Sequence, residues 1–308
     1  MNQLNIITIS SDFGAGKKGA YKGPKAVLDH LNNYSFEVNH VSIVPNHEGT
    51  VLETDFAKNA NLIVDLQEKA INEIKPCFAA PKVFNLIISG DHSNGHLGIS
   101  AVKEAYPDKN IGVIWIDAHA DLHNPGTTPS GNMHGMPLAM ALGIEINANH
   151  KNKLDQNELT LWKRLTHIGA SGICPKIKPE NLVFIELRDF EAEEAELINQ
   201  FQIKTFTPDL RKDLGVKSIS KQALEHLSAC DLIYVSFDVD SMDPSVSVGT
   251  GTPVMGGLSE NEAVELLAQF TNEPKLIALE FTEINPDLDR NLPMEIVASR
   301  IINAILPL

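Results

Sequence analysis

The sequence predicts an α/β protein in which a parallel β-sheet is covered by helices on both faces. Short runs rich in Ile, Val, Leu and Phe recur along the 308 residues. They are apolar almost throughout, as are strands buried on both faces. Helical patterns separate these runs, which indicates βαβ units. No linker rich in Gly, Ser or Pro divides the chain, so we expect residues 1–308 to form a single domain.

The predicted strands are these apolar runs, taken in chain order. They are Leu4–Ser10, Val38–Val44, Asn85–Ser89, Ile111–Asp117, Leu182–Leu187, a weaker run at Ile203–Thr207, Leu232–Asp238 and Leu276–Ile284. Ligands of parallel sheets bind at the carboxyl ends of the strands. The residues that follow each run are therefore the first candidates for a functional site.

The predicted helices lie between the strands. They are a helix from Pro24 to Leu31, Glu53–Glu73, His96–Tyr106, Met136–Leu142, Ala192–Phe201, Lys221–Ser228, Glu260–Thr271 and Pro293–Leu306. Ser259 is a suitable N-cap for the seventh of these helices, because acidic residues fill the first turn that follows it.

The composition argues against several classes of protein. The 25 basic and 40 acidic residues give a formal net charge of −15, the wrong sign for binding nucleic acid or an anionic membrane surface. No run approaches the about 18 apolar residues of a membrane span. The three cysteines are widely spaced, which favours a reducing compartment over a disulfide framework. With no secretory signal at the N-terminus, we expect a cytoplasmic protein that binds neither nucleic acid nor membrane.

A D-x-H-x-D pattern, Asp117, His119 and Asp121, follows the predicted strand that begins at Ile111. The period of two in an extended chain places all three side chains on one side. Their burial at a strand end would be costly without a counter-charge. For this pattern alone, an exposed acidic loop with an unrelated histidine is an equal alternative.

Two other strand ends carry similar residues. His92 follows the strand that ends at Ser89, and Asp238 and Asp240 stand at the end of the strand that begins at Leu232. The two aspartates alone could mark a turn before Pro244. Three strand ends that each deliver metal-type ligands favour a shared site.

The combined donor set predicts a pair of divalent metal ions. It consists of His92, Asp117, His119, Asp121, Asp238 and Asp240. Six donors without cysteine are too many for one tetrahedral zinc ion. Four carboxylates balance two divalent ions, which together generate hydroxide at neutral pH. Oxygen-rich ligation with some imidazole favours manganese, although iron, cobalt and nickel are chemically possible.

The motifs together resemble those of the ureohydrolase superfamily, and most closely those of its arginase members. They are Gly90–Ser93, Asp117–Asp121, Ser130–Gly135, Ser236–Pro244, Gly249–Pro253 and Glu283–Pro286. The resemblance implies a three-layer αβα fold with a mostly parallel, eight-stranded sheet. It implies two Mn²⁺ ions per chain, bridged by Asp117 and Asp238, and an association of the chain into trimers or hexamers.

The resemblance also implies the reaction and the residues that carry it. A metal-bridging hydroxide would attack the guanidinium carbon of L-arginine and release L-ornithine and urea. Asp121 would pass a proton to the leaving amine, and His134 would act as a proton shuttle. Glu283 would pair with the substrate guanidinium, with Thr252 close to it.

The residues that would bind the amino-acid end of the substrate match the arginase pattern only in part. Thr128, Ser130, Asn132 and Glu194 match it. His123 stands where the family has asparagine, Glu191 stands where it has aspartate, and Glu186 stands where it has glycine. The resemblance therefore leaves agmatine, 4-guanidinobutyrate and formiminoglutamate as competing substrates. Less favoured alternatives are a metal-dependent deacetylase and a non-catalytic regulator.

The segment Gly14–Gly19 has the G-x-G-x-x-G pattern of a dinucleotide-binding loop. That function also needs an acidic residue at the end of the second strand. Here Pro45 and Asn46 occupy that place. We therefore interpret the segment as a loop over the active-site cleft.

Overall fold

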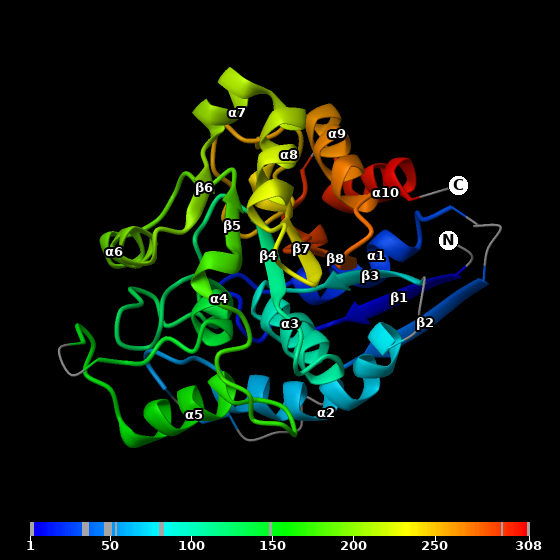
Figure 1. The fold of residues 1–308 in the computed structure, drawn as a ribbon. Helices are drawn as coiled ribbons and strands as arrows, with labels where there is room; N and C mark the ends of the chain where they lie inside the picture. The colour runs from blue at the N-terminus through cyan, green and yellow to red at the C-terminus, as the bar shows by residue number, and fades with distance from the viewer. Residues whose placement is uncertain are drawn as a thin grey trace.

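The structure, a computed structural model, describes residues 3–32, 37–45, 51–52, 54–79, 83–147, 150–290 and 292–306. The described residues form one eight-stranded sheet with the order β2-β1-β3-β8-β7-β4-β5-β6 (Figure 1). The strands are β1 (Gln3–Ile9), β2 (Glu37–Ile43), β3 (Val83–Ser89), β4 (Ile111–Ile116), β5 (Leu182–Ile185), β6 (Lys204–Phe206), β7 (Leu232–Asp238) and β8 (Leu276–Thr282). Every pairing is parallel. The predicted fold class is confirmed, and all eight predicted strands are present.

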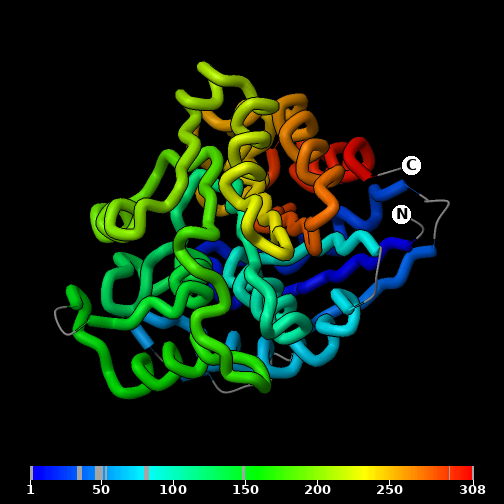
Figure 2. The backbone as a smooth tube through the Cα atoms, in the orientation of Figure 1, coloured from blue at the N-terminus to red at the C-terminus, as the bar shows by residue number. Residues whose placement is uncertain are grey.

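Helices cover both faces of the sheet. They are α1 (Gly23–Leu28), α2 (Ala60–Ala79), α3 (Ser93–Ala105), α4 (Pro137–Ala141), α5 (Gln156–Thr166), α6 (Ala192–Phe201), α7 (Pro208–Leu214), α8 (Val216–His226), α9 (Glu260–Thr271) and α10 (Met294–Ile305). Helices α2 to α5 pack on one face, and α1, α8, α9 and α10 pack on the other. Figure 2 shows the C-terminal helix beside the first helix of the chain.

Each face of the sheet has its own apolar core. In β4, Val113 and Trp115 belong to the core under α2 and α3, whereas Ile114 and Ile116 belong to the core under α9 and α10. Alternate residues of a strand point to opposite faces. All of these side chains are buried, which explains why the strand is apolar along its whole length.

The helices differ from the prediction at several positions: α1 ends at Leu28 rather than Leu31, and α3 begins at Ser93 rather than His96. Helices α5 and α7 were not predicted, although Asp155 and Glu158 form a capping box at the start of α5. Helix α2 begins seven residues later than predicted, with residue 53 outside the described residues, and it continues past Pro76 to Ala79. Helix α8 begins at Val216, directly after Gly215, rather than at Lys221. The capping box of α9 at Ser259 is present as expected.

A row of asparagines crosses three neighbouring strands. Asn39, Asn5 and Asn85 are paired in register on β2, β1 and β3. The Asn39 amide donates to Asn5 Oδ1 at 3.0 Å, and the Asn5 amide donates to Asn85 Oδ1 at 2.7 Å and to the Cys77 carbonyl at 3.0 Å. A slip of one residue would break this row, so it reinforces the register of these strands.

Candidate metal centre

The candidate ligands stand at the carboxyl ends of neighbouring strands. The strands β3, β8, β7 and β4 are adjacent in the sheet. His92 follows β3, Asp117 and His119 follow β4, and Asp238 ends β7. The sheet therefore brings together residues that are far apart in the sequence.

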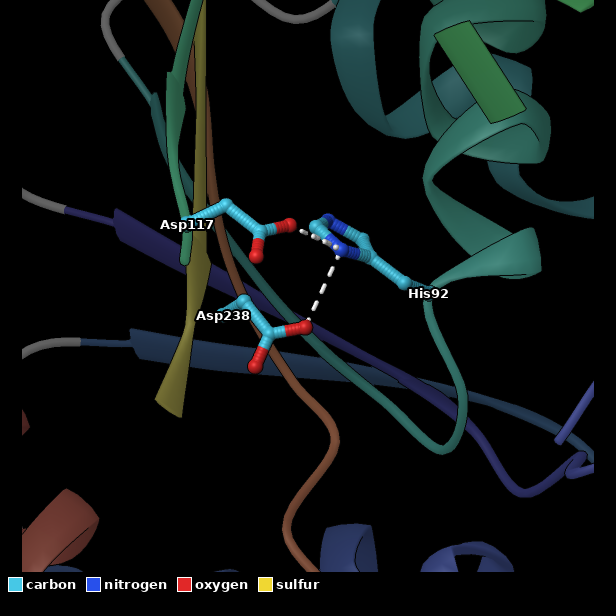
Figure 3. A group of neighbouring side chains, drawn as sticks. All are labelled: His92, Asp117 and Asp238. Carbon is cyan, nitrogen blue, oxygen red and sulfur yellow. Dashed lines mark ion pairs between the residues drawn. The ribbon is translucent and has the colours of Figure 1, made fainter. Parts of the chain in front are cut away.

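One group of ligands is centred on His92. Its Nδ1 atom lies 3.0 Å from Asp117 Oδ2, 3.1 Å from Asp238 Oδ2 and 3.1 Å from Asp121 Oδ2. In Figure 3 the imidazole of His92 and the carboxylates of Asp117 and Asp238 point toward one another. Each of these four residues is at most 6% exposed. Such a convergence of buried ligand atoms suits a metal ion.

A second group lies beside the first and shares Asp117 with it. Asp117, His119 and Asp240 offer ligand atoms that lie close together. His119 Nδ1 is 3.0 Å from Asp240 Oδ2 and 3.5 Å from Asp117 Oδ1. The two oxygens of Asp117 thus face different groups, as in a carboxylate that bridges two ions.

The hydrogen bonds of His92 test whether a cation fits here. Its Nε2 atom lies 2.8 Å from Ser236 Oγ, and the Ser236 hydroxyl donates to Glu280 Oε2 at 2.9 Å. The serine oxygen therefore accepts a hydrogen bond from Nε2–H, which leaves Nδ1 with a lone pair that faces three carboxylates. Neither Nδ1 nor Asp121 Oδ2 has a hydrogen-bond partner, although both are buried. Ligands bound at about 2.1 Å and at right angles are about 3 Å apart, so the arrangement fits a metal ion.

The electrostatics of the site also call for cations. Burial raises the pKa of Asp238, and the charges of Asp240 and Asp117 raise it further. Burial and the charge of Asp117 raise the pKa of Asp121 to about 6. Carboxylates in this position resist ionisation together unless positive charge lies among them.

Three residues behind the ligands were not identified from the sequence. The Trp115 ring stacks on His92 with centroids 3.9 Å apart, and its indole N–H donates to Asp117 Oδ2 at 3.0 Å. Ser236 and Glu280 fix the His92 ring, as described above. A charged residue inside the apolar run of β8 was the available signal for Glu280, which is fully buried.

A cleft of about 120 Å³ opens above the two groups. Its lining includes all the predicted site residues except Asp117 and Glu283, which lie beneath it. Those that line it are His92, His119, Asp121, His123, Thr128, Ser130, Asn132, His134, Glu191, Glu194, Asp238, Asp240 and Thr252. Asp189 also lines the cleft but was not predicted as a site residue. Its position in the same loop as Glu191 was the signal for it.

Glu283 and His134 form a pair at one side of the centre. Glu283 Oε1 accepts from the His92 backbone N–H at 2.9 Å and lies 3.1 Å from His134 Nδ1. Burial opposes a charge on His134, but Glu283 outweighs it and raises the pKa of His134 to about 9. Glu283 adopts a φ of 63°, a left-handed conformation that is uncommon for residues other than glycine and typical of functional sites.

The far wall of the cleft is acidic and contains one histidine. His123 Nε2 lies 3.0 Å from Glu191 Oε2, and its Nδ1 lies 3.1 Å from Thr127 Oγ1. Glu194 accepts from the backbone N–H groups of Leu122 and Glu191. Burial and the neighbouring Glu191 raise the pKa of Glu194 to about 8. Each ring nitrogen of His123 thus has a partner within the protein, Glu191 for Nε2 and Thr127 for Nδ1.

Hydroxyl groups stand on another part of the wall. Thr128 Oγ1 accepts from the backbone N–H groups of Ser130 and Gly131, and Ser130 Oγ accepts from that of Asn132. Since both oxygens serve as acceptors, their protons are free to donate to an anionic group in the cleft.

The glycine-rich loop after β1 contacts this wall. The Gly14 carbonyl accepts from the His134 backbone N–H at 3.2 Å, and the Gly14 N–H donates to Asp91 Oδ2 at 2.9 Å. A Cβ atom on Gly16 would lie 2.5 Å from the Asn132 amide nitrogen. Glycine permits this close approach, which agrees with a loop over the cleft.

Known proteins share this fold and these motifs. A model of the Arginase family matches residues 2–307. The chain belongs to the arginase family. Arginase from Bacillus subtilis strain 168 is 30% identical over 98% of this chain and 97% of its own length. Arginase from Brevibacillus brevis is 36% identical over 93% of this chain and 92% of its own length.

Solved structures of arginases superpose on the whole chain. The B. subtilis arginase structure has a TM-score of 0.82 at 30% identity, and 98% of each chain is covered. The structure of Entamoeba histolytica arginase in complex with L-ornithine has a TM-score of 0.84 at 27% identity, covering 99% of this chain and 97% of that one. This member of the arginase family is thus a ureohydrolase, an enzyme that hydrolyses C–N bonds.

No helix in the described part of the chain is both long enough and apolar enough to cross a membrane.

Proposed function

We propose that this ureohydrolase hydrolyses L-arginine to L-ornithine and urea with two Mn²⁺ ions. The observation that carries the proposal is the pair of ligand groups that share Asp117 at the floor of a cleft. The full-length similarity to curated arginases supports the choice of substrate.

The proposed metal ligands are the six residues that the sequence predicts. His92, Asp117, Asp121 and Asp238 would hold one ion, and Asp117, His119, Asp238 and Asp240 would hold the other. Divalent ions held by these residues would lower the pKa of water and so supply a hydroxide nucleophile at neutral pH. Four carboxylates and two imidazoles suit Mn²⁺.

The cleft walls would orient the amino acid. The free hydroxyl protons of Thr128 and Ser130 would donate to the α-carboxylate, together with Asn132. The carboxylates of Asp189 and Glu191 would attract the α-ammonium group, and Glu194 would lie beside it. An arrangement with donors on one part and acids on another fits a zwitterion.

Residues at the floor would manage the protons. Asp121 borders the cleft, where its carboxylate would take a proton from the nucleophile and pass it to the leaving amine. His134 stands between the cleft and Glu283, where it would exchange protons with solvent. Glu283 would attract the guanidinium, with Thr252 close to it.

A second candidate is 4-guanidinobutyrate, which carries a carboxylate but no α-ammonium group. The specific observation in its favour is the contact of His123 with Glu191. Because Glu191 is paired with His123, its carboxylate is less available to an α-ammonium group. Agmatine and formiminoglutamate complete the panel of substrates to test.

The experiment is urea release from each guanidino compound by protein that has been stripped with a chelator and reloaded with Mn²⁺. Formamide or ammonia release from formiminoglutamate is measured in parallel. Selective turnover of L-arginine by the reloaded protein is expected. Full activity of the stripped protein would exclude the metal mechanism, and selectivity for another compound would exclude arginine as the substrate.

We also propose that the enzyme works in the cytoplasm, since its three cysteines are free thiols and reducing compartments maintain that state. The trimer or hexamer stays a prediction, as does the organisation of the chain in a single domain. The expected lack of binding to nucleic acid or membrane likewise stays a prediction.

A further inference from the structure

Four successive backbone carbonyls beside the cleft are held by two arginines. Arg188 donates from Nη2 to the Val254 carbonyl at 2.9 Å and from Nε to the Met255 carbonyl at 3.2 Å. Arg211 Nη2 donates to the carbonyls of Gly256 and Gly257 at 3.3 and 3.2 Å. The two guanidinium groups thus bind consecutive pairs of carbonyls along residues 254–257.

This segment has little else to fix it. None of the residues 252–257 is buried, and Met255 is 71% exposed. Besides the arginines, Asp243 Oδ2 accepts from the Gly256 N–H at 2.7 Å. The segment is anchored at its end by Leu258, which is buried and hydrogen-bonded to Ser241 and Asp243. The residues before Leu258 depend on the polar contacts.

The segment leads directly to the cleft. Thr252 lines the cleft, and its hydroxyl donates to Asp240 Oδ2 at 3.1 Å. Arg188 Nη2 also donates to the Asp240 backbone carbonyl at 2.7 Å. Arg188 therefore ties the segment to the same residue that Thr252 contacts.

Glu186 joins the two arginines. Its carbonyl accepts from Arg188 Nη1 at 2.9 Å, and its Oε1 accepts from Arg211 Nε at 2.7 Å. Arg211 also contacts Glu262 in the first turn of α9. The three residues connect the end of β5, helix α7, helix α9 and the segment 254–257.

The position of Glu186 is unfavourable by itself. It has a φ of 71°, it is fully buried, and its Oε2 has no hydrogen-bond partner. A left-handed conformation and a buried carboxylate each destabilise a chain. A strained residue of this kind points to a role in the neighbouring site.

We propose that Glu186, Arg188 and Arg211 form a clasp that positions the Thr252 side of the cleft. Glu186 is the positioning residue that couples the two arginines. The inference rests on the proposed function only for its kinetic consequence, because the order of the segment is measurable without a substrate.

The test compares Arg211→Met with Arg300→Met as a matched control. Arg300 makes a two-point ion pair with Glu260, also in the first turn of α9, but does not contact the clasp. Hydrogen–deuterium exchange of the amides in 252–257 is measured in the Mn²⁺-loaded proteins. KM and kcat for L-arginine are measured on the same samples.

For Arg211→Met we expect amide exchange in 252–257 to be about tenfold faster and KM to rise about tenfold, with kcat within about threefold of the parent. Arg211→Lys retains the charge without the planar guanidinium group. Its amide exchange and KM should lie between those of Arg211→Met and those of the parent. Arg300→Met should match the parent in both readouts. Parent-like exchange in Arg211→Met would overturn the clasp.

Arg188→Met provides an independent variant if Arg211→Met does not fold, because Arg188 is only half-buried. It should also accelerate exchange in 252–257, and unchanged exchange would overturn the proposal. If the parent does not act on L-arginine, the proposed substrate is wrong. In that case the amide exchange of residues 252–257 alone tests the proposed clasp.

Discussion

At the scale of single residues, His92 illustrates how the site is prepared for a cation. Its ring is fixed on three sides, by Trp115, Ser236 and the carboxylates around Nδ1. Ligand orientation of this kind removes the freedom that a metal ion would otherwise have to restrict. The ligands themselves were predictable because each follows an apolar strand. Ser236 and Glu280 were not, since they become partners of His92 only through the packing of distant strands.

The Ser236→Ala variant should weaken metal binding without altering a ligand. It removes the acceptor for His92 Nε2–H, so the ring loses its fixed orientation. We expect the affinity for Mn²⁺ to fall about 10- to 100-fold, as measured by calorimetric titration. Ser299→Ala is the control, because Ser299 is equally buried and donates only to a backbone carbonyl. Equal affinities in the two variants would contradict the assigned role of Ser236.

The pair of His134 and Glu283 should make stability depend on pH. The pKa of His134 is raised from 6.5 to about 9, so the folded state holds its proton more tightly than the unfolded state does. The stabilisation is fully present below pH 6.5 and is lost as the pH rises through about 9. We expect it to amount to about 3 kcal/mol.

Urea unfolding of the chelator-treated protein at pH 6 and pH 9.5 measures this effect. Glu283→Gln retains an acceptor for the His92 N–H but removes the charge that raises the pKa of His134. The variant should therefore lose most of the change in unfolding free energy between the two pH values. If Glu283→Gln retained the full change in unfolding free energy, that change would have to come from other titratable groups.

At the scale of elements, the sequence predicted strands better than helices. Strands such as β4 are apolar throughout, and their ends agree with the prediction within one or two residues. Helix α7 is short and mostly exposed, so its apolar stripe is weak. Helix α5 buries Leu161, Trp162 and Leu165 on one face, and the prediction missed this pattern. The position of Glu186 was recognised as unusual, but its partner Arg211 lies on an element that was not predicted. The clasp could therefore not be predicted from the sequence.

The asparagine row should contribute to the stability of the sheet. Asn5→Ala leaves the Cys77 carbonyl and Asn85 Oδ1 without the donor that they have now. We expect the free energy of unfolding to fall by about 1–3 kcal/mol. Asn39→Ala, at the exposed end of the same row, should cost less than about 1 kcal/mol because water replaces the lost contact. Urea unfolding of both variants measures the difference, and equal losses would contradict a role for burial.

At the scale of the whole molecule, the parallel sheet explains why so few motifs define the site. All eight strands end on the same edge, and four adjacent ends supply the ligands and Glu283. The metal set was accessible from the sequence for this reason. The loops that shape the cleft are different, because the sheet does not fix their side chains, and contacts such as that of His123 with Glu191 depend on the conformation of the loops.

Removal of metal should destabilise the entire domain, since the ligands join several strands. At a metal concentration 100 times Kd, binding contributes about 2.7 kcal/mol, so a chelator should lower the melting temperature by roughly 5 °C. Asp238→Asn should abolish most of this response in differential scanning calorimetry. Asp209→Asn, a change at a fully exposed aspartate, should retain it. A chelator response that persists in Asp238→Asn would locate the stabilising ion elsewhere.

The unequal burial of the two histidines has a kinetic consequence. The side chain of His92 is 1% exposed, whereas that of His119 is 25% exposed and borders the cleft. Of two bound ions, the one beside His119 would therefore be more open to solvent than the one beside His92. We expect the ion beside His119 to be lost first on depletion. A chelator pulse should release manganese in two phases, the first fast and the second slow.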